Sequence, residues 1–197
     1  MNQKDKNLYR YGRGVVALYA KEPVLGRVKT LMQAVLGQEG ALSLHKALIR
    51  YVFRNMQESR LCPVQLWVAQ SQALSKANHS HDEFFLSLCN KRDIYDQEGL
   101  DLGAKMAYTA RQALRSSDYV VLVGSDCASV DAAYLEQALR ALESGEQIVL
   151  GPAEDGGYVL LGLRVVPDCL FAAVPWGEEQ VMAITRQNLA AAGLTWL

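Results

Sequence analysis

The sequence predicts an α/β protein, folded as a three-layer α/β/α sandwich around a mostly parallel sheet. Short apolar runs rich in β-branched residues recur along the chain, as at residues 14–20 and 119–123. Segments with helical periodicity separate them, for example residues 132–144. Apolar runs without a polar face indicate strands buried on both sides, and their alternation with helices favours parallel strands covered by two helical layers.

Length and charge limit the class of protein. A chain of 197 residues can bury a substantial core, so we predict one domain over residues 1–197. Its 20 Lys and Arg against 21 Asp and Glu give a formal net charge of −1. Because nucleic-acid binders use a broad basic field, we expect no nucleic-acid partner, and any site for an anion must be local.

Residues 1–13 are polar and predicted to be flexible. No apolar segment resembles a signal peptide, and no apolar run approaches the ~18 residues of a membrane span. The four cysteines are scattered without CxxC spacing, which predicts buried thiols in a reducing compartment instead of a zinc site or disulfides. They are Cys62, Cys89, Cys127 and Cys169. We therefore expect a cytoplasmic protein.

The first strand, residues 14–20, is followed by a basic loop over residues 21–30. Gly26 would let backbone amides approach an anion, while Arg27 and Lys29 would neutralise phosphate oxygens. The loop lacks the GxxxxGK[ST] spacing of a Walker motif. A solvated basic turn is the alternative interpretation.

A helical pattern runs over residues 31–58, with a break indicated by Gly37 and Gly40. His45 lies in this pattern and is predicted to be a packing or surface residue, because no Cys or second His stands at metal spacing. Residues 63–69 predict a second strand, and residues 71–90 a polar then helical crossing that contains His79 and His81 in a solvated loop.

Residues 93–106 predict a short edge strand, a glycine-rich turn and the start of a helix that continues to Leu114. Gln97, Gly99 and Lys105 are candidates for ligand contact in this turn.

The run at 119–123 predicts a central strand that ends in Gly124-Ser-Asp-Cys127. Ligands of open α/β sheets gather beyond the carboxyl ends of the strands, where Asp126 would bind a divalent metal and its phosphates. The alternative is that Asp126 is only the N-cap of the helix over residues 132–144, although Ser129 or Asp131 could serve equally well.

A further strand over residues 148–150 leads into Gly151-Pro-Ala-Glu-Asp-Gly-Gly-Tyr158 and then into a strand at 158–163, for which the intervening turn allows an antiparallel direction. The glycine pair favours a simple turn, but Glu154 and Asp155 place a second carboxylate cluster after a strand. One basic and two acidic loops, each following a strand, together favour a functional site.

Several dispersed motifs resemble, in order, the bacterial DUF2064 family. They are Lys21-x-Pro-x-x-Gly26-x-Val-Lys29-Thr30, Gln97-x-Gly99-x-Asp-Leu-Gly-x-Lys-Met106, Gly124-Ser125-Asp126-Cys127, Gly151-Pro-Ala-x-Asp155-Gly156-Gly157-Tyr158, and Trp176 with Val181. The match extends over residues 15–185. The resemblance implies a glycosyltransferase A-like, Rossmann-like fold of the nucleotide-diphospho-sugar transferase type, related to the molybdenum cofactor and phospholactate guanylyltransferases.

By that resemblance, Lys29, Asp126 and Asp155 would be catalytic. Asp126 would bind Mg²⁺ or Mn²⁺, and Asp155 would be a second metal ligand or an acceptor contact. Substrate contacts would come from Lys21, Gly26, Arg27, Thr30, Gln97, Gly99, Ser125, Gly156, Gly157, Tyr158 and Trp176.

The chain departs from the family pattern at Leu31, where the family usually has an arginine, and at Ala128 and Glu178. It also ends at Leu197, before the family's acidic Asp-Val-Asp segment. Two hypotheses follow. One is a metal-dependent glycosyltransferase or nucleotidyltransferase that uses a nucleoside triphosphate or nucleotide sugar and an unknown small-molecule acceptor. The other is a catalytically weakened nucleotide-binding or scaffold protein of the same fold. The motifs leave the donor, the acceptor and the oligomeric state open.

Overall fold

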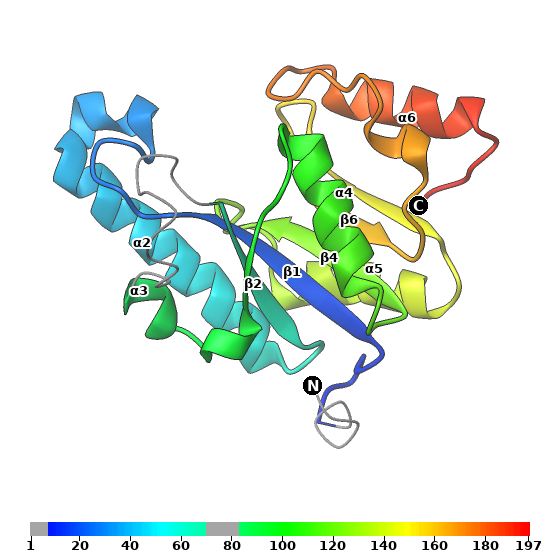
Figure 1. The fold of residues 1–197 in the computed structure, drawn as a ribbon, viewed down its shortest axis with the longest axis horizontal. Helices are drawn as coiled ribbons and strands as arrows, with labels where there is room; N and C mark the ends of the chain where they lie inside the picture. The colour runs from blue at the N-terminus through cyan, green and yellow to red at the C-terminus, as the bar shows by residue number, and fades with distance from the viewer. Residues whose placement is uncertain (1–7, 70–82) are drawn as a thin grey trace.

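The computed structural model describes residues 8–69 and 83–197, and shows one sheet with helices on both faces (Figure 1). The sheet has six strands in the order β3-β2-β1-β4-β6-β5. The strands are β1 (Gly14–Lys21), β2 (Val64–Ala69), β3 (Ile94–Asp96), β4 (Tyr119–Gly124), β5 (Ile148–Pro152) and β6 (Tyr158–Leu163). A strand is predicted from the sequence at each of these places, and each is confirmed. His79 and His81 lie outside the described residues.

Strand direction brings the polar loops to one edge of the sheet. β1 pairs in parallel with β2 and β4, and β2 with β3, whereas β6 is antiparallel to both β4 and β5. The predicted antiparallel strand at 158–163 is therefore confirmed, and β5 runs in the same direction as β4. Consequently the loops 22–32, 97–101, 125–131 and 153–157 all lie at the edge where β1, β3, β4 and β5 end. We call this the carboxyl edge.

The first helical layer consists of α2 (Gln33–Ser59), α3 (Glu83–Leu86) and α5 (Ala132–Glu143). Because side chains alternate along a strand, Val16 and Leu18 of β1 point to this face, where they join one buried cluster with Phe53 of α2 and Leu139 of α5. Short 3-10 helices, η1 (Thr30–Met32) and η2 (Lys91–Asp93), lead into α2 and β3.

The second layer contains α4 (Leu102–Ala113), α6 (Val181–Ala191) and the 3-10 helix η3 (Asp168–Phe171). Val15 and Ala17 of β1 point to this face and pack with Met106 of α4 and Met182 of α6. Burial of both faces of the sheet confirms the predicted three-layer sandwich. From the sequence alone no helix is predicted after residue 163, and α6 is therefore missed.

The helical pattern at 31–58 breaks where predicted, but only at Gly37. Gly37 has φ 68° and ψ 174°, whereas Gly40 lies within the helix. The part of α2 before Gly37 turns away from the rest of the helix (Figure 1). Leu31 and Val35 in this segment expose 93% and 81% of their surface, so position 31 faces solvent and not the core.

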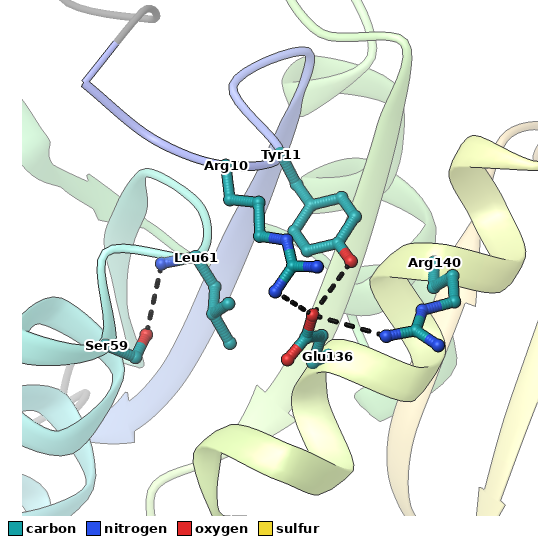
Figure 2. A network of polar contacts seen from close by, with 6 residues as sticks. All are labelled: Arg10, Tyr11, Ser59, Leu61, Glu136 and Arg140. Atoms are coloured by element: carbon teal, nitrogen blue, oxygen red, sulfur yellow. Dashed lines mark hydrogen bonds and ion pairs between the residues drawn. The ribbon is translucent and has the colours of Figure 1, made fainter.

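The segment over residues 8–13 packs against the body of the protein, although the sequence predicts flexibility over residues 1–13. Tyr11 is buried, and its hydroxyl donates to Glu136 Oε1 over 3.1 Å. Arg10 forms an ion pair of 2.6 Å with the same oxygen, which Arg140 also approaches (Figure 2). The aromatic ring and the shared carboxylate explain the difference, because they give a polar segment a partner on α5.

Cys62 is buried as predicted, but Cys89, Cys127 and Cys169 are only half-buried; all are free thiols. Within residues 8–69 and 83–197, no helix combines the length and hydropathy that a bilayer crossing requires.

Candidate functional site

The basic loop after β1 is built to hold Lys29 in an uncommon backbone conformation. Pro23 and Val28 are buried and anchor the loop, and the Lys21 ammonium donates to the Arg27 carbonyl oxygen over 3.1 Å. Gly26 has φ 74°, in the left-handed region that suits glycine, but Lys29 also has φ 47°. A left-handed conformation is costly for a lysine, and such residues concentrate at functional sites.

The ammonium of Lys29 lies 3.0 Å from Oδ1 of Asp126, so the basic loop contacts the loop that follows β4. The Asp126 side chain remains 58% exposed, whereas that of Lys29 is 21% exposed. The N-cap of α5 is Asp131, whose carboxylate accepts from the Tyr134 amide. The alternative interpretation of Asp126 as a helix cap is therefore wrong, and its carboxylate is directed to the basic loop.

Cys127 directly follows Asp126, and the charges of both predicted carboxylates act on its thiol. Burial is the main cause that raises the pKa of its thiol, and the charges of Asp126 and Asp155 raise it further while Lys29 lowers it. The thiol is thus kept protonated near neutral pH, which disfavours a thiolate nucleophile here.

The acidic loop after β5 is fixed by its own turn and by α6. Asp155 Oδ1 accepts from the Gly157 amide over 3.0 Å. Gly156 has φ 84°, and a Cβ at this position would lie 2.0 Å from the Glu179 carbonyl oxygen. The Gly156 oxygen also accepts from the Met182 amide over 2.8 Å. Asp155 is therefore placed at the carboxyl edge by a turn that only glycine can make.

The loop after β3 holds its predicted ligand residues in structural contacts. The Gln97 side-chain amide donates to the carbonyl oxygens of Ala20 and Trp67, over 3.3 and 2.9 Å, and so ties the ends of β1 and β2 together. A Cβ at Gly99 would lie 2.6 Å from the Lys105 amide nitrogen, so glycine allows the loop to approach α4. These contacts explain the residue types without a ligand, and the predicted substrate contacts of Gln97 and Gly99 stay predictions.

The remaining predicted substrate residues divide into two groups. Thr30 begins η1 and is exposed. Ser125 is buried, and its backbone amide donates to the Tyr19 carbonyl oxygen. Tyr158 and Trp176 form an edge-to-face pair with ring centroids 6.4 Å apart. A Cβ at Gly103 would lie 2.6 Å from the Trp176 ring, so Trp176 packs directly on α4.

His45 lies at this site, although from the sequence alone it was expected only to pack or to face solvent. Its side chain is 4% exposed, Nε2 lies 2.9 Å from the Lys21 carbonyl oxygen, and Nδ1 lies 4.0 Å from Asp126 Oδ1. The sequence carries one signal that reveals it. His45 is a polar residue on the buried stripe that Ala41 and Ile49 define, at i, i+4 and i+8.

The two aspartates fit a metal that arrives with a nucleotide. Among the described residues, no group of three or more His, Cys, Asp and Glu side chains could hold a metal ion by itself. Mg²⁺ in nucleotide sites is usually held by one or two carboxylates together with phosphate oxygens and water. Asp126 and Asp155 supply that number, provided that Lys29 leaves Asp126.

A cavity of about 770 Å³ lies away from these residues, at the amino ends of β1 and β2. Leu8, Val15, Phe53, Pro63 and Tyr95 are among the residues that line it, and it contains none of the predicted site residues.

Comparison with known proteins agrees with this architecture. The model of a family described as "Uncharacterized protein conserved in bacteria (DUF2064)" matches residues 52–178. A crystal structure from Desulfovibrio desulfuricans G20, provisionally described as a nucleotide-diphospho-sugar transferase, has a TM-score of 0.79 at 27% identity, covering 94% of this chain and 78% of that one. No curated protein matches the chain.

Two more distant structures share the fold. A cytidylyltransferase from Leptospira borgpetersenii has a TM-score of 0.53 at 9% identity, covering 93% of this chain and 74% of its own. A CMP:2-keto-3-deoxy-manno-octonic acid synthetase complexed with CTP has a TM-score of 0.50 at 9% identity, covering 93% and 88%. The predicted nucleotide-diphospho-sugar transferase fold is therefore confirmed.

Proposed function

This chain belongs to the bacterial family DUF2064, and we propose that it is a metal-dependent transferase whose donor is a nucleoside triphosphate or a nucleotide sugar. The observation that carries the proposal is the ion pair of 3.0 Å between Lys29 and Asp126 at the carboxyl edge. It joins a cation suited to phosphate and a carboxylate suited to a divalent metal at the place where ligands bind in open α/β sheets.

The basic loop would bind the donor phosphates. Lys29 exchanges Asp126 for a phosphate oxygen, and Arg27 and the amides near Gly26 contribute charge-assisted hydrogen bonds. Fixed donors directed at the phosphates stabilise charge as it develops on the leaving group, and this accounts for much of the catalysis in such transfers.

The acidic side of the site would hold the metal. Asp126 and Asp155 carry the oxygen ligands, and the bound ion would supply charge neutralisation between the phosphates. No covalent protein nucleophile takes part, which agrees with the protonated thiol of Cys127 next to these carboxylates.

The likeness to the Desulfovibrio protein supports a nucleotide-linked donor, and the synthetase with bound CTP shows that this fold can hold a nucleoside triphosphate. Glycosyl transfer and nucleotidyl transfer use the same arrangement, so the acceptor decides between them. The small-molecule acceptor and the cytoplasmic location remain part of the proposal.

A thermal-shift panel tests the proposal. Nucleoside triphosphates and nucleotide sugars are added to the protein with Mg²⁺, with Mn²⁺ and with a chelator. A ligand at 100 times its dissociation constant stabilises the fold by about 2.7 kcal/mol, which gives a measurable rise in melting temperature. We expect metal-dependent stabilisation by at least one compound, followed by turnover in the presence of an acceptor extract. If none of the nucleotides or nucleotide sugars raises the melting temperature, the proposal is contradicted.

The second candidate is a nucleotide-binding or scaffold protein with weakened catalysis. Leu31, in place of an arginine, offers no charge to a phosphate, and Lys29 already neutralises Asp126. In the same panel, stabilisation that is independent of metal and without turnover would favour this candidate.

A further inference from the structure

The imidazole of His45 has one buried nitrogen that finds no hydrogen-bond partner in the part of the chain that the structure describes. Its Nε2 lies 2.9 Å from the Lys21 carbonyl oxygen. A carbonyl oxygen only accepts, so Nε2 carries the proton and Nδ1 of the neutral ring presents a lone pair. Nδ1 is buried, and no atom of residues 8–69 or 83–197 forms a hydrogen bond with it. Buried polar atoms are nearly always bonded in folded proteins, so an unused acceptor indicates a partner that binds from outside the chain.

The unused nitrogen faces the carboxylate of Asp126. Nδ1 lies 4.0 Å from Oδ1. When the ring is neutral both atoms are electron-rich, and a cation bound between them would stabilise their approach. Lys29 reaches the carboxylate oxygen at 3.0 Å, but it forms no hydrogen bond to Nδ1. Bonds from a divalent ion such as Zn²⁺ to nitrogen and oxygen are each about 2.0–2.2 Å long, so an ion almost midway between Nδ1 and Oδ1 would contact both atoms.

We propose that His45 Nδ1 is a ligand, together with Asp126, for the divalent metal of this site; the inference rests on the proposed function and names a further metal-binding residue in it. The other ring nitrogen already has the arrangement that metal-binding histidines show. Such histidines almost always donate their second N–H to a backbone carbonyl or a carboxylate, which fixes the tautomer and the direction of the ring. Here the Lys21 oxygen, at the end of β1, has that role.

The identity of the ligands predicts the metal. Imidazole binds Mn²⁺, Co²⁺ and Zn²⁺ better than Mg²⁺, which prefers oxygen. A site of two carboxylates alone would accept Mg²⁺ equally well. The inference therefore predicts that the wild-type site prefers Mn²⁺ to Mg²⁺ and that this preference depends on His45.

Lys29 controls access to the metal position. Its ammonium balances the charge of Asp126, and a metal ion next to it would be repelled. Transfer of Lys29 to a phosphate removes that repulsion. The metal should therefore bind much more tightly together with pyrophosphate than alone, and inorganic pyrophosphate is the suitable probe because it carries the phosphates without requiring the correct base.

The test uses Mn²⁺ with inorganic pyrophosphate and two substitutions. His45→Gln places an amide where it can still donate to the Lys21 oxygen but removes the Nδ1 lone pair. His45→Asn puts an amide near the position of Nδ1 and loses the bond to the Lys21 oxygen. Thr185→Val is the control, because Thr185 is another buried residue, lies on α6, and has a hydroxyl without a partner among the described residues. Thermal unfolding of each variant checks that it folds.

Pulsed electron paramagnetic resonance of bound Mn²⁺ detects a directly bonded ¹⁴N nucleus. We expect this signal in the wild type and in Thr185→Val, and its loss in His45→Gln. Calorimetry should show that His45→Gln binds Mn²⁺ with pyrophosphate about tenfold more weakly, with little change for Mg²⁺, as removal of a ligand or of its supporting partner usually costs tenfold or more. His45→Asn should keep part of the affinity without the nitrogen signal.

Two results would overturn the inference. Tight binding of Mn²⁺ and pyrophosphate without a nitrogen signal, and equal affinity in His45→Gln, would leave the proposed function intact and remove His45 from the metal site. Absence of Mn²⁺ binding to the wild type, with or without pyrophosphate, would overturn both the inference and the metal dependence of the proposed transferase. Nucleotide binding in the thermal-shift panel distinguishes that case from a protein that binds no nucleotide.

Discussion

Lys29 and Asp126 form an ion pair of 3.0 Å that joins the loops following two adjacent parallel strands, β1 and β4. Ion pairs of this kind, with one partner more than half exposed, contribute only about 0–1 kcal/mol to stability. Yet Lys29 has a left-handed backbone, which costs free energy. The arrangement is therefore better explained by ligand binding than by stability.

Asp126→Asn should leave stability within about 1 kcal/mol of the wild type, because it removes a largely exposed charge and little packing. It should strongly reduce the metal-dependent part of nucleotide binding, since an amide is a poor substitute for a carboxylate on a hard cation. Chemical denaturation and calorimetry with and without Mn²⁺ measure both effects. A variant that is much less stable but binds metal and nucleotide normally where it is folded would show that Asp126 has only a structural role.

The same substitution should lower the pKa of the Cys127 thiol. Burial raises that pKa most, and the charge of Asp126 raises it further, while Lys29 lowers it. Asp126→Asn removes one raising charge and leaves Lys29 without its anionic partner. The pH at which iodoacetamide alkylates Cys127 half-maximally should therefore move down, because the thiolate is the reacting form.

Cys89 is the internal control for this measurement. Burial and Asp93 raise its pKa to about 11, and Asp126 is not among the causes. Peptide mass spectrometry should show an unchanged pH profile for Cys89 in both proteins. A profile for Cys127 that is also unchanged would mean that the Asp126 carboxylate is not directed to this thiol.

Leu31→Arg should tighten binding of a nucleoside triphosphate about tenfold, because a charge-assisted hydrogen bond contributes roughly 1.5–3 kcal/mol. Leu31 is 93% exposed and follows Lys29 and Thr30 directly, so an arginine can extend without disturbing the core. The gain should shrink at high ionic strength.

Val35→Arg controls for added charge alone, since Val35 is 81% exposed and lies in the same segment. Calorimetric titration of both variants at two salt concentrations separates the effects. An equal gain in both variants would indicate only a general electrostatic attraction of the nucleotide to added positive charge. No gain in Leu31→Arg would weaken the view that the missing arginine at position 31 limits catalysis.

Gly156→Ala should destabilise the acidic loop more than Gly177→Ala does. Both glycines have a left-handed φ, of 84° and 89°, so alanine costs about 1–2 kcal/mol at either. At Gly156 a Cβ would also lie 2.0 Å from the Glu179 oxygen, whereas at Gly177 nothing lies within 4 Å. Crowding should add about 1–3 kcal/mol at Gly156 only. Equal melting temperatures for Gly156→Ala and Gly177→Ala would show that the Glu179 backbone, just before α6, does not restrict the acidic loop.

Most of the fold was predictable because it depends on local patterns. The run over residues 119–123 has no polar residue and became the central strand β4, and the glycine at position 37 broke the helix where expected. The placement of Asp126 and Asp155 at one edge followed from strand direction, which the order of strands and helices largely determines. Their chemical roles stay predictions.

Other features depend on contacts between distant segments and could not be read from local pattern. His45 looked like one more residue of a periodic helix, and only the path of β1 brings it to Lys21 and Asp126. Gln97 is predicted to contact a ligand, and the structure adds that its side-chain amide joins the ends of two strands. Tyr11 lay in a polar terminus, and its hydrogen bond to Glu136 required the position of α5.

The most direct test of the central claim is the location of Mn²⁺ by anomalous diffraction, in crystals of the wild-type protein grown with the nucleotide that gives the largest thermal shift. The account predicts one strong peak bonded to the Asp126 carboxylate, with the nucleotide phosphates between it and the side chains of Lys29 and Arg27. A peak and a nucleotide found elsewhere, such as the cavity lined by Leu8, Phe53 and Pro63, would contradict the account.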